Sequence, residues 1–185
     1  MPDNVLEQIK SAYFGDSNFK LYDHQKKAIE YIDSGKSVIV SVPTASGKSL
    51  IAYYGIMRAL SMGGKAMYIA PLKALVSEKY QELKELMAGK YSVGISTGDY
   101  DSGTDIIGRY DVIVCTSEKA DSMMHHDPDY FTNLNVLVVD EIHNTGDSSR
   151  GPTIEIICTA ASVGVAVRTF SFFSLKFSSM NSLRE

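Results

Sequence analysis

The chain has 185 residues, a length that fits one α/β domain with a core large enough to fold alone. Its apolar content of 44% and charged content of 22% are those of an ordinary globular protein and exclude a disordered or fibrous chain. The formal net charge of -4 argues against a protein that coats nucleic acid through a basic face, so any nucleic-acid contact must be local.

Short apolar runs rich in β-branched residues alternate with longer amphipathic segments. This alternation is typical of parallel strands connected by crossover helices. We expect strands at residues 37–42, 65–70, 92–96, 111–115, 134–140 and 165–172. We expect helices at residues 5–13, 24–33, 48–60, 72–87, 118–124 and 153–161, with Asp23 as the N-cap of the second. The predicted fold class is therefore α/β, a mostly parallel sheet with helices on both faces.

We expect a single domain over residues 1–185, with a helical lead-in at residues 1–20 and a divergent segment at residues 162–185. That last segment holds six serines, four of the seven phenylalanines and one acidic residue. Its phenylalanines are Phe170, Phe172, Phe173 and Phe177. They could form an exposed edge strand, which would favour self-association, or they could fill the core.

A loop of small residues joins the strand expected at 37–42 to the next helix, and it reads Pro43, Thr44, Ala45, Ser46, Gly47, Lys48 and Ser49. Small residues let successive N–H groups surround an anion, and the helix beginning near Gly47 directs its positive dipole end there. Lys48 would reach the β- and γ-phosphates of a nucleotide, and the Ser49 hydroxyl would bind Mg²⁺. The sequence predicts a phosphate loop, although Val42 replaces the usual first glycine; a chance Gly-Lys-Ser is the alternative.

The apolar run at residues 135–139 ends in Asp140, Glu141, Ile142 and His143. Ligands of open α/β sheets bind at the carboxyl ends of strands, so these groups should share a rim with the phosphate loop. Asp140 would orient the metal through its water shell, and Glu141 would polarise the water that attacks the γ-phosphate. We count Lys48, Asp140, Glu141 and His143 as candidate catalytic residues; solvated loop charges are the alternative.

The cysteines and the paired histidines do not suggest a metal site or a disulfide. Cys115 and Cys158 lie in separate apolar segments, where a small-hydrophobe role is favoured over a metal or disulfide role. His125 and His126 have no second ligand pair at metal spacing. The sequence shows no leader of basic and apolar character and no run long enough to span a membrane, so we expect a cytoplasmic protein.

Gln25, the phosphate loop and residues 140–143 resemble, in this order, the motifs of superfamily-two DExH-box helicases, and especially of the archaeal superkiller-like DNA helicases. The resemblance covers about residues 20–160, including residues 150–153. It implies a RecA-like fold, ATP with Mg²⁺ as the cofactor, and Gln25 as the residue that pairs with the adenine edge. Members of that family often have prolines where this chain has Asp23 and His24.

Three further segments look like the loops with which that family holds the backbone of one strand. They contain Pro71 and Lys73, then Thr97 and Gly98, then Thr116 and Ser117. Hydroxyls, helix N-termini and lysines hold phosphates without reading bases, as a translocating motor requires. Each segment alone would be an ordinary turn or a solvated lysine, so their order carries the prediction. We expect single-stranded DNA as the partner, with RNA left open.

The resemblance weakens after residue 161. The family continues to a strand that ends in Ser-Ala-Thr, where this chain has Ser174, Leu175 and Lys176. The second RecA-like domain, which in the family supplies arginines to the transition state, is missing before Glu185. Because an arginine finger contributes several powers of ten to turnover, we expect ATP hydrolysis near background and no unwinding. We interpret the chain as a truncated or decayed helicase gene product, or as a fragment.

Three functions therefore stay open at this point. One is the ATP-binding motor domain of a DNA helicase that needs a partner, and another is a non-hydrolysing nucleotide-binding remnant or interaction module. A small nucleotide kinase fits the length and the phosphate loop but not the later motifs. Such kinases need an arginine-rich lid, whereas the arginines here are scattered: Arg58, Arg109, Arg150, Arg168 and Arg184.

Overall fold

The computed structural model of the chain describes residues 2–14, 20–43, 46–98, 109–126, 134–141 and 168–173. For residues 168–173, and for the first and last residues of the N-terminal helix, the backbone alone is described. Within these ranges no helix has the length and apolar character that a membrane span requires. The same part of the chain shows no cluster of three or more side chains able to hold a metal ion.

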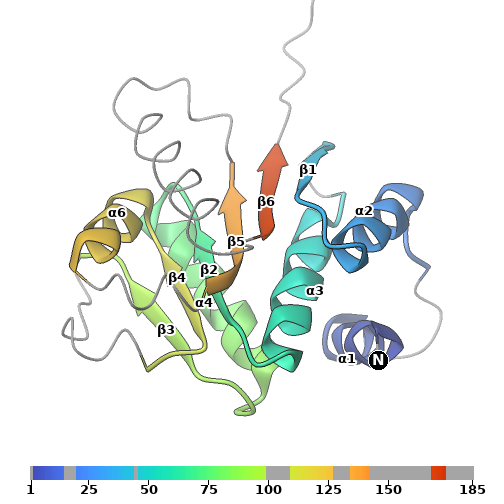
Figure 1. The fold of residues 1–185 in the computed structure, drawn as a ribbon, viewed down its shortest axis with the longest axis horizontal. Coiled ribbons are helices and arrows are strands. Elements are labelled where there is room, and N and C mark those ends of the chain that lie inside the picture. Colours follow the sequence, from blue (N-terminus) through green and yellow to red (C-terminus); the bar gives the residue numbers. More distant parts are fainter. Residues whose placement is uncertain are drawn as a thin grey trace, which may run out of the picture.

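Helices and strands alternate as predicted (Figure 1). In chain order the elements are α1 (Pro2–Phe14), α2 (Asp23–Asp33), β1 (Val38–Ser41), α3 (Lys48–Ser61), β2 (Lys65–Ile69), α4 (Lys73–Met87), β3 (Val93–Ser96), β4 (Val112–Cys115), α6 (Ser117–His126), β5 (Leu134–Asp140) and β6 (Arg168–Phe173). All six expected strands are present. The helix expected at residues 153–161 lies outside the described residues.

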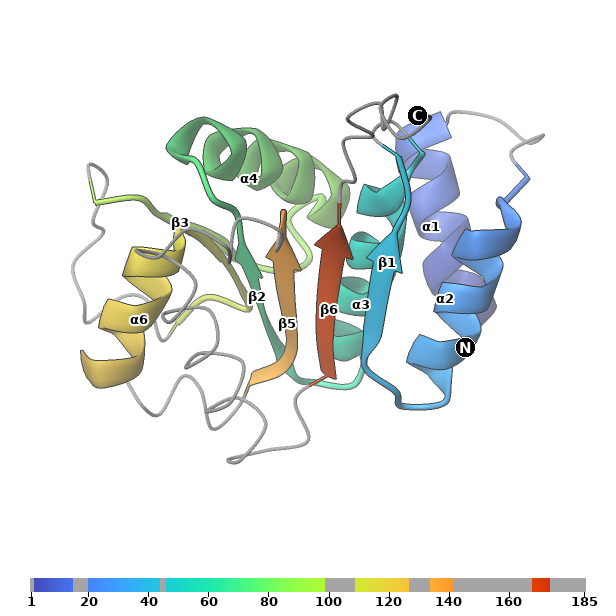
Figure 2. The same ribbon diagram turned by 90° about the horizontal axis from the view of Figure 1, so that it is seen from above.

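The strands form one sheet in the order β1-β6-β5-β2-β4-β3, and every described pair is parallel. Figure 2 shows β6 between β1 and β5, with α1 and α2 beyond β1. Phe170 pairs with Val38 on one side and with Val138 on the other. The edge-strand interpretation of the phenylalanine segment is therefore wrong, because β6 has no free hydrogen-bonding edge. The edges among the described strands are β1 and β3.

Alternate residues of the central strands enter two separate cores, as a buried parallel sheet requires. Ala66 and Tyr68 of β2 pack with α1 to α4 on one face. Met67 and Ile69 of the same strand pack on the other face with Ala120 and Met123 of α6. Helices thus cover both faces of the sheet, as predicted. Cys115 is fully buried in the second core, which agrees with its expected role as a small hydrophobe.

Gly94, in the middle of β3, leaves room for the ring of Tyr110. A Cβ atom at this glycine would lie 2.5 Å from Cδ2 of Tyr110. We expect Gly94→Ala to lower the free energy of unfolding by about 1–2 kcal/mol, because the ring must leave its packed position. Urea unfolding measures this change. In a Tyr110→Leu background the same alanine should cost little, and an equal cost in both backgrounds would contradict the steric reason.

Candidate nucleotide site

The register of the sheet brings the phosphate loop and the acidic motif to one rim. Val40 of β1, Phe172 of β6 and Asp140 of β5 lie level with one another. Neighbouring strands are about 4.8 Å apart, which separates the backbones of Val40 and Asp140 by about 10 Å. The strands are parallel, so their carboxyl ends point the same way. The loop after β1 and Asp140 therefore lie at the same rim, on either side of the end of β6.

The described part of the phosphate loop has the backbone that an anion site needs. Gly47 is the N-cap of the 14-residue helix α3 and has a left-handed φ of 75°. The Ser46 hydroxyl donates to the Pro43 carbonyl at 2.6 Å, which closes the turn before it. The Lys48 ammonium donates to the Val42 carbonyl at 3.1 Å, so it lies back along the loop. Thr44 and Ala45 lie outside the described residues, whereas Ser49 is half-buried in the first turn of α3.

Gln25 fastens α2 to this loop. Its side chain is 1% exposed, and its Nε2 donates to the Gly47 carbonyl at 3.0 Å. Its Oε1 accepts the Tyr22 N–H at 2.9 Å. A Cβ atom at Gly47 would lie 2.5 Å from Gln25 Nε2, so the Gln25 side chain in this position leaves no room for any other residue at 47. Glycine is needed here for both its φ and its lack of a side chain.

The start of α2 differs from the prediction. Tyr22 is the N-cap residue, and Asp23 is the first residue of the helix, so the predicted N-cap Asp23 is wrong. The amide oxygen of Gln25 satisfies the Tyr22 N–H, which is half of a capping box. The Asp23 carboxylate is exposed and pairs instead with Lys26 at 3.2 Å.

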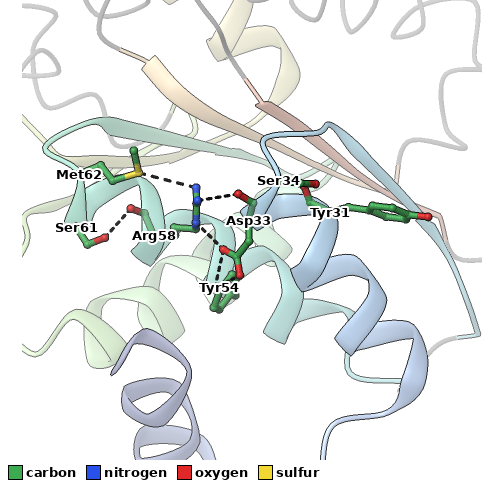
Figure 3. Close-up of polar contacts among 7 residues, drawn as sticks. All are labelled: Tyr31, Asp33, Ser34, Tyr54, Arg58, Ser61 and Met62. Carbon is green, nitrogen blue, oxygen red and sulfur yellow. Dashed lines mark hydrogen bonds and ion pairs between the residues drawn. The ribbon is translucent and has the colours of Figure 1, made fainter. Parts of the chain in front are cut away.

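The other end of α2 is held on α3 by an ion pair (Figure 3). Asp33 Oδ1 lies 2.6 Å from Arg58 Nε, and the Tyr54 hydroxyl donates to the same carboxylate at 2.9 Å. Arg58 Nη2 also donates to the Asp33 carbonyl at 3.1 Å. The helix that carries Gln25 is thus attached at both ends to α3 and its preceding loop. The sequence shows no signal for this three-residue contact.

Asp140 is held by a tyrosine from the neighbouring strand β2. The Tyr68 hydroxyl donates to Asp140 Oδ2 at 2.8 Å, and the Glu141 N–H donates to Oδ1 at 3.0 Å. Glu141 has a left-handed φ of 54°, which turns the chain sharply out of β5. Each carboxylate oxygen keeps a further lone pair that could accept from metal-bound water. His143 lies outside the described residues.

Tyr68 was not predicted, and its surroundings keep its hydroxyl protonated. Burial raises the pKa of Tyr68 well above 10.0, and the Asp140 charge and hydrogen bond raise it further. A buried neutral phenol is a donor to Asp140 at any ordinary pH. The carboxylate is therefore fixed in orientation before any ligand arrives.

Replacing Tyr68 should change how stability depends on pH. Because folding raises the pKa of Tyr68, its contribution is complete below pH 10.0 and is lost as the pH rises toward the folded-state pKa. Each pH unit in that window costs about 1.4 kcal/mol. In Tyr68→Phe the free energy of unfolding should fall less steeply above pH 10.0, as measured by urea unfolding. The exposed-tyrosine control Tyr31→Phe should keep the wild-type slope; identical slopes for both variants would refute this.

The six residues predicted to bind the DNA backbone lie along the other half of the same rim. Pro71 and Lys73 follow β2, Thr97 and Gly98 follow β3, and Thr116 and Ser117 follow β4, which are adjacent strands. The hydroxyl residues are nearly inaccessible, at 5%, 6% and 2% exposed for Thr97, Thr116 and Ser117. A DNA strand bound to this surface would contact the exposed Lys73 and Gly98 before the buried hydroxyl groups. DNA contact by these residues stays a prediction.

The profile of the DEAD/DEAH box helicase family matches residues 22–174. The chain belongs to this family. This helicase domain is 50% identical over 148 residues to the ATP-dependent DNA helicase Hel308 of Thermoplasma acidophilum, covering 80% of the chain and 22% of that protein. It is 44% identical over 157 residues to Hel308 of Pyrococcus horikoshii, covering 84% of the chain and 22% of that protein. The chain spans about a fifth of the length of these curated relatives.

Solved structures show the same fold for this helicase domain. The DUF1998 helicase MrfA, in a crystal structure bound to DNA and AMPPNP, aligns with a TM-score of 0.77 at 24% identity, covering 96% of the chain and 27% of that protein. The helicase Lhr of Mycobacterium smegmatis, bound to ssDNA and AMP-PNP, aligns with a TM-score of 0.74 at 20% identity, covering 91% and 24%. The predicted RecA-like fold and the predicted helicase family are both confirmed.

Proposed function

We propose that this helicase domain binds ATP with Mg²⁺ and serves as the ATP-binding motor domain of an ATP-dependent DNA helicase in the cytoplasm. The observation that carries the proposal is the shared rim, where the loop before α3 and Asp140 flank β6. The residues present fit ATP with Mg²⁺, because a left-handed glycine, a lysine and a helix N-terminus follow β1 at the rim where Tyr68 holds the Asp140 carboxylate.

Binding would use the main-chain N–H groups at Gly47 and Lys48 and the charge of Lys48. Lys48 would exchange its bond to the Val42 carbonyl for a phosphate oxygen. Ser49 and Asp140 would hold Mg²⁺, which supplies charge neutralisation between the β- and γ-phosphates when it is bound. Tyr68 holds the Asp140 carboxylate in one orientation through its hydrogen bond to Oδ2. Gln25 would pair with the adenine edge through its second Nε2 hydrogen and second Oε1 lone pair, since its bonds to Gly47 and Tyr22 use one of each.

Hydrolysis would depend on Glu141. Its place directly after β5 lets it accept a hydrogen bond from the attacking water, while Lys48 stabilises the charge that develops on the transferred phosphoryl group. An arginine from a second domain would add several powers of ten to turnover. We therefore propose that these residues alone hydrolyse ATP weakly. Unwinding would need a second RecA-like domain, because a motor moves along DNA by binding it alternately with two domains.

Single-stranded DNA would lie along the half of the rim formed by β2, β4 and β3. The relatives at 40–50% identity are named as DNA helicases, which supports this placement. The exposed Lys73 in the first turn of α4 supports it as well. Phosphate contacts from Lys73, Gly98 and nearby N–H groups would be independent of sequence. DNA would bind on one half of the rim and the nucleotide on the other. Because β2 and β5 are neighbouring strands, the binding of one ligand would affect the binding of the other through them.

Phosphate release from ATP, with and without single-stranded DNA, tests the proposal. Wild type should release phosphate slowly and faster with DNA, and both Lys48→Ala and Glu141→Gln should abolish the release. Glu141→Gln should still bind ATP, because the glutamate acts on water rather than on the phosphates. ATP binding without any phosphate release in wild type would favour the alternative, a non-hydrolysing nucleotide-binding module. No ATP binding at all would overturn the proposal.

A further inference from the structure

Two consecutive side chains of α2 reach two consecutive carbonyl groups of the phosphate loop. His24 Nε2 lies 3.1 Å from the Ser46 carbonyl oxygen, and Gln25 Nε2 lies 3.0 Å from that of Gly47. A carbonyl oxygen only accepts hydrogen bonds, so His24 must carry a proton on Nε2 and donate it. Both contacts join residues 22 positions apart in the sequence.

These bonds set the direction of the N–H groups on the other side of each peptide. The described peptide bonds are all trans, and in a trans peptide the carbonyl and the following N–H point in opposite directions. Holding the Ser46 carbonyl toward His24 therefore directs the Gly47 N–H away from α2. Holding the Gly47 carbonyl toward Gln25 does the same for the Lys48 N–H. These two N–H groups belong to the proposed phosphate cradle.

The His24 ring is itself held in place. It stacks on the Tyr22 ring with a centroid distance of 5.6 Å and an interplanar angle of 10°. The helix beneath it is attached to α3 through Asp33 and Arg58. A donor fixed in this way restricts the loop with little loss of side-chain entropy on binding.

We propose that His24 is a positioning residue of the phosphate loop, which orients the Gly47 N–H for a nucleoside triphosphate. This inference rests on the proposed nucleotide-binding function. His24 acts through the loop backbone and not through contact with the nucleotide. Together with Gln25 it makes a two-point attachment, so that the loop is preorganised when the phosphates arrive.

Binding of a fluorescent ATP analogue with Mg²⁺ to the full chain tests the inference. His24→Phe keeps the ring stack and removes the donor, and we expect it to weaken binding about three- to tenfold. His24→Gln places an N–H donor at the same reach and should bind within about twofold of wild type, whereas the shorter His24→Asn should behave like His24→Phe. The exposed neighbour Asp23→Ala is the control and should bind like wild type.

A second readout is independent of the nucleotide. The Gly47 and Lys48 amide ¹⁵N and ¹H chemical shifts of the ligand-free chain should change in His24→Phe and return toward wild type in His24→Gln. Wild-type binding and wild-type amide shifts in His24→Phe would overturn the inference and leave the proposed function intact, provided that Lys48→Ala loses binding. Equal losses in His24→Gln and His24→Phe would also overturn it, because a lost fold rather than a lost donor would then explain both. Absence of binding by wild type would overturn the proposed function itself.

Discussion

Lys48→Ala is expected to reduce the affinity for ATP with Mg²⁺ by about one to two powers of ten, because a hydrogen bond to a charged group contributes about 1.5–3 kcal/mol. The ammonium lies at the start of α3 and donates to the Val42 carbonyl at 3.1 Å. Phosphate oxygens would replace that carbonyl as the acceptor. Loss of the side chain therefore removes a charged contact to the ligand and leaves the sheet and core in place.

Equilibrium binding of a fluorescent ATP analogue measures the effect, and thermal unfolding without nucleotide checks the fold. Lys90→Ala is the matched control, since Lys90 is an exposed lysine in the turn after α4 whose ammonium lies 5.2 Å from the Tyr91 ring centroid. We expect Lys90→Ala to bind like wild type. Unchanged affinity in Lys48→Ala would show that nucleotide does not use the loop before α3.

Local patterns in the sequence were enough to predict the elements and the rim that carries the site. Buried parallel strands such as β2 and β5 are recognisable as short apolar runs. The loop before α3 is recognisable by its small residues and Gly47. Parallel pairing then places Asp140 beside that loop without any knowledge of side-chain contacts. The predicted and observed limits of helices and strands differ by at most three residues, as for the strand expected at 165–172 and found at 168–173.

Contacts between distant residues had no signal in the sequence. The Tyr68 bond to Asp140 joins residues 72 apart, and the His24 contact with Ser46 joins residues 22 apart. Each depends on how two elements pack, which no window of sequence describes. The N-cap error is local: the helix begins at Asp23 itself, so Tyr22 takes the N-cap position and the exposed Asp23 carboxylate pairs with Lys26. The position of β6 was missed since strand order follows from packing rather than from composition.

A buried lysine of α4 pairs with two glutamates of the same helix, and one of these glutamates also accepts a hydrogen bond from α3. Lys79 is 8% exposed, and its ammonium lies 3.0 Å from Glu78 Oε1 and 3.1 Å from Glu82 Oε1. The Tyr53 hydroxyl of α3 donates to the Glu82 carboxylate. Burial lowers the pKa of Lys79, but the hydrogen bonds to Glu78 and Glu82 outweigh it, so the pKa remains above 10.5. Lys79 is thus charged and paired in the folded chain.

Lys79→Met is expected to lower the free energy of unfolding by about 2 kcal/mol. Removing one partner of a buried pair usually costs about 3–5 kcal/mol, and the partial exposure of the Glu82 side chain, 29%, reduces that cost. Methionine keeps the apolar stem, so the loss reports the missing charge rather than a cavity. Urea unfolding measures it. Lys84→Met, an exposed lysine one turn later, should change stability by less than about 0.5 kcal/mol.

The double variant Lys79→Met/Glu82→Gln distinguishes a lost ion pair from poor packing. Glutamine keeps an acceptor for the Tyr53 hydroxyl and removes the carboxylate charge that Lys79→Met leaves without its lysine. Because Lys79 and Glu82 are in contact, we expect the double variant to lose at least about 0.5 kcal/mol less than the sum of the two single losses. Additive losses would mean that the two charges do not interact, and the loss in Lys79→Met would then report poorer packing of α4 rather than a missing ion pair.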